Sequence, residues 1–168
     1  RTERRFGPTP ARAPGEGRHP GFGGDGRAPG VRIAGGEARW YRDRWIRSNK
    51  VSDALGEERK PGARNPRTDT ANTNIIGING RTFAIVEAGG FPVELTDELD
   101  TNVHMPLDGT LDQAFSAHPH FDPKTGEMHA ICYNASTFDT VWHVVLDKDG
   151  RVSRQEPIAV KEGPSIHD

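Results

Sequence analysis

The dipeptide Asn79-Gly80 constrains the fold strongly, because it joins two short apolar runs by a tight turn. A type I′ turn needs positive φ at both central positions, and asparagine and glycine adopt such angles at low cost. The flanking runs, residues 75–78 and 82–86, are rich in β-branched and aromatic residues. The sequence therefore predicts an antiparallel β-hairpin over residues 75–86.

Two further turn signals next to apolar runs occur toward the end of the chain. Residues 121–126 form a turn signal marked by proline and glycine, and residues 147–150 form another that ends in glycine. Strands of five to seven residues between such turns are typical of sandwiches, barrels and propellers. The strands expected around these turns are residues 127–133, 141–146 and 151–158.

No segment shows a sustained apolar repeat at helical spacing, and only residues 96–100 could form one helical turn. We therefore expect an all-β fold built of antiparallel hairpins. Residues 1–36 differ from the rest, since they hold ten glycines and five prolines with few apolar residues. The sequence predicts a loop-rich segment over residues 1–36, followed by a β-domain over residues 37–168.

The two parts of the chain also differ in charge. Residues 1–67 hold 16 Lys and Arg against 8 Asp and Glu, whereas residues 68–168 hold 6 against 16. A basic half is compatible with nucleic-acid binding, but the chain has neither an aromatic-and-basic RNA module nor a helix-turn-helix pattern. We therefore expect a solvated, arginine-rich segment and no nucleic-acid partner. Salt-sensitive binding of nucleic acid would contradict this expectation.

Cysteine content and hydropathy narrow the class of protein further. Cys132 is the single cysteine, which excludes an internal disulfide framework and a cysteine-based zinc site. No run approaches the ~18 consecutive apolar residues of a membrane helix. The first residues lack the apolar core of a signal peptide. We expect a cytoplasmic protein.

Several of the seven histidines are candidate metal ligands. His118 precedes Pro119, which fixes its own φ and favours an extended backbone at the residue before it. A rigid extended backbone suits a metal ligand, although a histidine considered alone is more often a surface residue. His120 would face the same side as His118 in a regular strand. The histidines expected on the surface of the sheet are His129 and His143.

Glu87 is the carboxylate of interest, because it ends a strongly apolar strand and stands just before two glycines. A carboxylate that faces an apolar interior needs a partner, such as the N–H group of a metal-bound imidazole. A glutamate at a strand end that points into water is an equally open alternative.

Two further histidines, His19 and His104, are expected in loops without supporting partners, and His167 is the penultimate residue.

A set of short stretches, found in the same order along the chain, resembles the carotenoid cleavage oxygenase family, which includes lignostilbene dioxygenases and retinoid enzymes. The string Ala-His-Pro, continued by Asp-Pro-Lys-Thr-Gly-Glu up to Glu127, is specific, and the ordered set is more specific still. The stretches that carry the resemblance are residues 7–10, 22–26, 40–44, 71–74, 84–90, 92–95, 115–127 and 163–168.

The resemblance implies a seven-bladed β-propeller that holds a non-haem Fe(II) ion on its axis by four histidines. Residues 37–168 would supply about the first two to three blades. His118 matches the first iron ligand and His167 the second, whereas Glu87 matches a carboxylate that orients one of the later ligands, such as His167. The implied activity is that of a dioxygenase, which uses O2 to cleave a conjugated C=C bond of a carotenoid, apocarotenoid or stilbene to carbonyl products.

The same resemblance implies that the chain is an N-terminal fragment. The third and fourth iron ligands of the family lie in later blades, so we expect the 168 residues to be inactive alone. Only 33% of the residues are hydrophobic, which fits a stack of sheets whose edges are covered by missing blades. Gly26 is followed by Arg-Ala-Pro, where the family usually has an apolar residue and then a histidine.

The expected partners are O2 and an apolar conjugated small molecule. Contact with a membrane surface is a further expectation, because carotenoid-cleaving relatives often dock on membranes to extract their substrate. The alternative function is a β-propeller binding module without metal. Two further histidines on later strands, each with a buried glutamate nearby, would favour the enzyme over this alternative.

Overall fold

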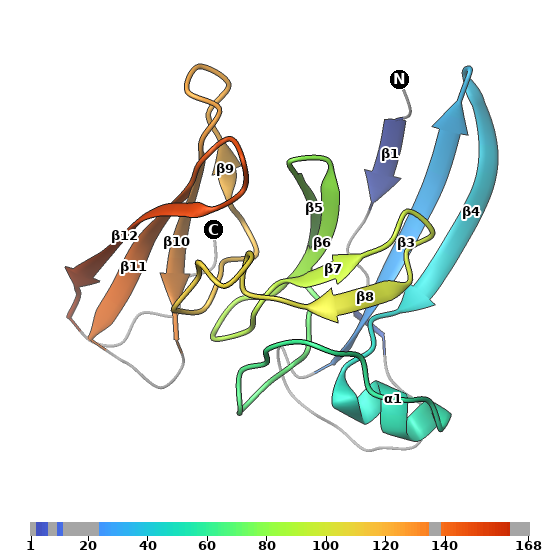
Figure 1. Cartoon of the computed structure of the whole chain (residues 1–168), viewed down its shortest axis with the longest axis horizontal. Helices are drawn as coiled ribbons and strands as arrows, with labels where there is room; N and C mark the ends of the chain where they lie inside the picture. The colour runs from blue at the N-terminus through green and yellow to red at the C-terminus, as the bar shows by residue number, and fades with distance from the viewer. Residues whose placement is uncertain (1–2, 7–9, 12–23, 135–138, 162–168) are drawn as a thin grey trace.

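The computed structural model describes residues 3–6, 10–11, 24–134 and 139–161. Within these residues the strands form three four-stranded antiparallel sheets, accompanied by one helix (Figure 1). The first sheet has the order β1-β3-β2 with β4 paired to β3, the second β5-β6-β7-β8, and the third β12-β11-β10-β9. The all-β fold of antiparallel hairpins is therefore confirmed.

The elements in chain order are β1 (Glu3–Phe6), β2 (Pro10–Ala11), β3 (Asp25–Ala34), β4 (Glu37–Trp45), α1 (Asn49–Leu55), β5 (Asn74–Ile78), β6 (Arg81–Ile85), β7 (Val93–Leu95), β8 (Thr101–His104), β9 (His120–Phe121), β10 (Met128–Tyr133), β11 (Thr140–Leu146) and β12 (Val152–Ala159).

The second sheet contains the predicted hairpin. Strands β5 and β6 pair in the register that sets Ile78 opposite Arg81. Asn79 and Gly80, which join them, have φ angles of 46° and 75°. Both angles are positive, as a type I′ turn requires, so the local turn chemistry specified this hairpin correctly.

The third sheet contains the two other predicted hairpin regions. In the turn between β9 and β10, the backbone N–H of Asp122 donates to the carbonyl of Glu127 over 2.8 Å. In the turn between β11 and β12, the N–H of Gly150 donates to the carbonyl of Asp147 over 3.0 Å. Both turns lie where the glycine and proline signals predicted them.

The main core lies between the second and third sheets. Side chains alternate across a strand, so one face of β10 and β11 points into this core, and the other face carries His129, Ile131 and His143. The buried residues of the core are Ile78, Phe83, Ile85, Leu107, Leu111, Phe115, Ala130, Cys132, Val144 and Leu146. The histidines on the outer face are therefore not needed to fill the core.

The first sheet corrects the expectation of a loop-rich segment up to residue 36. Asp25–Ala34 form the ten-residue strand β3, which makes a hairpin with β4. Glycine and proline weaken the local preference for a strand, but cross-strand packing outweighs it. The guanidinium of Arg27 lies 5.0 Å from the ring centre of Trp45, and that of Arg32 lies 5.3 Å from that of Trp40. The prediction of loop structure is thus wrong for residues 25–34.

The short helix α1 was not predicted, whereas residues 96–100 form a turn instead of the helical turn considered for them. Ser48 caps α1, because its hydroxyl accepts from the backbone N–H of Val51 over 3.2 Å. Gly56 ends the helix in the left-handed conformation with φ of 66°. In the part of the chain that the structure describes, no helix has the length and apolar character needed to cross a membrane.

Candidate functional site

The backbone that leads into His118 is held on both sides. The N–H of His118 donates to the hydroxyl of Ser116 over 3.1 Å. The buried Ala117 accepts, through its carbonyl, a hydrogen bond of 3.0 Å from the side-chain amide of Asn74 on β5. With Pro119 after it, His118 is fixed in the segment between the second and third sheets.

Glu87 follows β6 and is buried, with only 4% of the residue exposed. The chain turns sharply after it, since Ala88 has φ of 61° and Gly89 has φ of 125°. The carbonyl of Gly89 accepts a hydrogen bond of 2.7 Å from the side chain of Asn65, which anchors this turn. The alternative of a water-facing Glu87 is therefore wrong.

The structure brings Glu87 and His118 together. Oε1 of Glu87 lies 3.0 Å from Nε2 of His118, with 3% of the Glu87 side chain and 27% of the His118 side chain exposed. A carboxylate at this distance is placed to orient the imidazole ring. The resemblance linked Glu87 with a later ligand such as His167, but His167 lies outside the described residues, as does His19.

His104 differs from its prediction as a loop residue without partners. It ends β8 with 2% of the residue exposed, and its Nε2 lies 2.8 Å from the carbonyl oxygen of Arg47. Burial lowers the pKa of His104, which favours the neutral ring. Its partner is 57 positions away in the sequence, so no local signal could have revealed it. His104 is a structural histidine.

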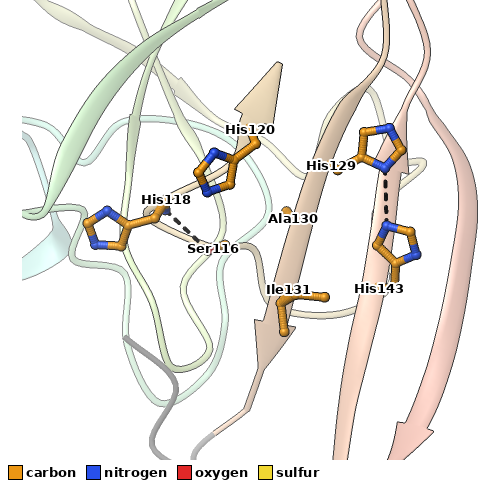
Figure 2. Close-up of a pocket in the computed structure, with 7 residues that line it drawn as sticks. All are labelled: Ser116, His118, His120, His129, Ala130, Ile131 and His143. Carbon is orange, nitrogen blue, oxygen red and sulfur yellow. Dashed lines mark hydrogen bonds between the residues drawn. The ribbon is translucent and has the colours of Figure 1, made fainter. Parts of the chain in front are cut away.

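A pocket of about 150 Å³ opens beside His118 (Figure 2). Its lining residues are Ser116, His118, His120, His129, Ala130, Ile131 and His143. The pocket is bounded mainly by imidazole rings, and its accessible surface is mostly apolar. His129 and His143 line it facing each other, although the sequence indicated only surface positions for them.

The donor set of this region is limited. In the described ranges, no group of three or more His, Cys, Asp and Glu side chains is arranged to hold one metal ion. Cys132 belongs to the core, and burial raises the pKa of its thiol to about 12, so it stays protonated near neutral pH. The region therefore offers imidazoles and one buried carboxylate, but no reactive thiolate.

Comparison with known proteins identifies the family. The sequence profile described as RPE65, retinal pigment epithelial membrane protein, matches residues 4–168. A carotenoid cleavage oxygenase of Mycobacterium tuberculosis is 41% identical over 169 residues, which cover 97% of this chain and 33% of that protein. Isoeugenol monooxygenase of Pseudomonas nitroreducens is 29% identical over 167 residues, with 89% of this chain and 34% of the relative covered.

Solved structures agree with the fold. A lignostilbene dioxygenase of Pseudomonas brassicacearum superposes with a TM-score of 0.78 at 24% identity, over 99% of this chain and 38% of that one. A Synechocystis apocarotenoid oxygenase superposes with a TM-score of 0.75 at 24% identity, over 99% of this chain and 40% of that one. The three sheets of this chain thus correspond to part of the β-propeller of these proteins, as predicted.

The chain spans about a third of the length of the curated relatives it matches. The relatives are named as oxygenases that act on carotenoids, isoeugenol or stilbenes, and the match to the family profile extends almost from end to end of the chain. On this evidence, the chain belongs to the RPE65 family, which is the family of the carotenoid cleavage oxygenases.

Proposed function

We propose that the whole protein is a non-haem Fe(II)-dependent dioxygenase that cleaves a conjugated C=C bond of a carotenoid, apocarotenoid or stilbene. In this reaction one molecule of O2 and one C=C bond give two carbonyl products, so the atoms balance without another oxidant. The observation that carries the proposal is the 3.0 Å approach of Glu87 to His118 across two sheets. These are two of the three residues that the family resemblance assigned to the iron site.

The side chains present fit one side of such an iron site. Neutral imidazole suits iron, and ligating imidazoles are commonly oriented by a nearby carboxylate. His118 supplies the imidazole, Glu87 supplies a carboxylate that is almost fully buried, and His167 is the second proposed ligand. Iron(II), when bound, supplies the redox chemistry that activates O2.

Glu87 acts in this proposal by charge and by orientation. Four neutral imidazoles leave the charge of Fe(II) uncompensated, and a buried carboxylate offsets part of it. Its position beside Nε2 of His118 also holds the ring in one orientation. Because Glu87 is buried, its charge is weakly screened by water, which strengthens both effects.

We further propose that the 168 residues alone are inactive, because two ligands hold iron weakly and the chain covers only a third of its relatives. O2 and an apolar conjugated molecule are the proposed reactants. The proposed location is the cytoplasm, with contact to the membrane surface when the substrate is a carotenoid. The other blades would supply the remaining ligands.

The test uses the full-length protein that contains this chain. We expect purified protein to retain iron after dialysis and to consume O2 with a hydroxylated stilbene or an apocarotenal. His118→Ala should lose both iron and O2 uptake, whereas His120→Ala, an exposed neighbour, should keep both. Glu87→Gln should weaken iron binding by about 10–100-fold, and the exposed Glu58→Gln should not.

The opposite results are equally clear. Full-length protein without iron and without O2 uptake would reject the enzyme and support the binding module. Equal losses in His118→Ala and His120→Ala would reject the assignment of His118 as a ligand.

A further inference from the structure

His129 and His143 form a pair on the outer face of the third sheet. They lie on the neighbouring strands β10 and β11, where the direct partner of His143 is Ile131, two positions after His129. The two histidines are therefore diagonal neighbours on one face. Nδ1 of His129 lies 3.2 Å from Nε2 of His143, and the two rings are stacked with 17° between their planes (Figure 2).

The separation of these two nitrogen atoms matches that of neighbouring metal ligands. Zn²⁺ binds imidazole nitrogen at about 2.0–2.1 Å, so two ligands at a tetrahedral angle lie roughly 3.3–3.4 Å apart. The observed 3.2 Å is close to that value, and binding requires both rings to rotate until their lone pairs converge on the ion. Without metal, the same two nitrogens share one N–H···N hydrogen bond.

A carboxylate stands at the far side of the pair. Oε2 of Glu127 lies 3.7 Å from Nε2 of His129, the ring nitrogen that faces away from His143. A carboxylate there favours the tautomer with the proton on Nε2, which leaves the lone pair of Nδ1 free for a metal. Glu156 on β12 is the direct cross-strand neighbour of His143 and adds a second negative charge nearby.

From these contacts we propose that His129 and His143 bind a divalent transition-metal ion of the zinc type, on the β10–β11 side of the pocket that His118 also lines. The ion takes the place of the proton shared by Nδ1 of His129 and Nε2 of His143. That proton moves to the other nitrogen of its own ring, so both imidazoles stay neutral and the pair loses no proton overall. The remaining coordination positions are filled by water from the pocket, whose volume of about 150 Å³ holds several molecules.

The affinity of this site for the metal ion is limited, because only two protein side chains coordinate it. No third His, Cys, Asp or Glu in the described ranges completes a cluster with the pair. Two protein ligands bind more weakly than the four of a structural zinc site, so the ion exchanges with solvent. Protons compete for the same nitrogens, so affinity decreases on acidification.

The test uses the 168-residue chain carrying His118→Ala, which separates the pair from the proposed iron site. We expect calorimetry with Zn²⁺ to show binding, and ¹⁵N spectra of the imidazoles to shift at Nδ1 of His129 and Nε2 of His143. His129→Gln or His143→Gln should weaken binding at least about tenfold, whereas Glu58→Gln, at an exposed position outside the pocket lining, should change it less than about twofold. Glu127→Gln keeps both ligands and should weaken it by a smaller factor.

Three results would overturn the proposal. They are an absence of Zn²⁺ binding in the His118→Ala chain, binding that leaves the two nitrogen signals unshifted, and an unchanged affinity in His143→Gln. Circular dichroism establishes that each variant is folded, and Glu127→Gln serves where a histidine variant does not fold. None of these results depends on iron in the full-length protein, so this site and the oxygenase can fail independently.

Discussion

Glu87 shows how far reasoning from single residues reaches. A carboxylate that faces an apolar interior costs free energy unless it has a partner, so a buried and partnered Glu87 was one of the two interpretations that the sequence left open. The sequence did not indicate which histidine is the partner, because that depends on how two sheets pack. His118 was marked by Pro119, a local signal, whereas the pair of His129 and His143 arises only from the register of β10 and β11.

His104 gives a prediction at the scale of one residue. Burial lowers its pKa, so below the ordinary histidine pKa of about 6.5 the unfolded chain binds more protons than the folded chain. The free energy of unfolding is therefore higher at neutral pH, where His104 is neutral in both states, and decreases on acidification, because protons bind preferentially to the unfolded chain. We expect the urea midpoint to decrease between about pH 7 and pH 5, and to decrease less in His104→Gln.

Asn102→Gln, an exposed and non-titratable position on the same strand, is the control for this measurement, and its pH dependence should equal that of the unchanged chain. If the urea midpoint of His104→Gln depends on pH in the same way as that of the unchanged chain, the lowered pKa of His104 does not contribute to the stability of the fold.

Among the elements, those bounded by turn chemistry were predictable and those stabilised by distant partners were not. The hairpins around Gly80 and Gly150 carry their signals within a few residues. Strand β3 instead contains Gly26, where a Cβ atom would clash with the carbonyl oxygen of Ala71. A close approach of two distant segments thus requires the glycine that makes the strand look like a loop.

The β5–β6 hairpin offers a matched test with two glycines. Gly80 has φ of 75°, whereas Gly77 lies within β5 and has no close contact at its Cβ position. We expect Gly80→Ala to lower the free energy of unfolding by about 1 kcal/mol, because an L-residue is strained at positive φ. Gly77→Ala should leave it unchanged or raise it slightly. Equal effects in denaturant unfolding would contradict the turn assignment.

At the scale of the whole molecule, the site depends on the core between the second and third sheets. Glu87 follows a strand of one sheet, and His118 precedes a strand of the other. Their separation is therefore set by how residues such as Phe83 and Phe115 pack between the sheets. The sequence indicated hairpins and their order, but it carried no local signal for this packing, which joins residues from distant parts of the chain.

Phe115 connects this core with the site, because it is 1% exposed and stands three positions before His118. Phe115→Ala should lower the free energy of unfolding by about 3–5 kcal/mol, a large share of the roughly 5–15 kcal/mol typical of a domain. Phe121→Ala is the control, since Phe121 is 61% exposed and its truncation should cost no more than about 0.5 kcal/mol. Both are measured by urea unfolding of the 168-residue chain. If the sheets pack as described, Phe115→Ala also broadens the imidazole ¹⁵N signals of His118 below the unfolding transition. Equal midpoint shifts for the two variants would mean that the second and third sheets do not share this core.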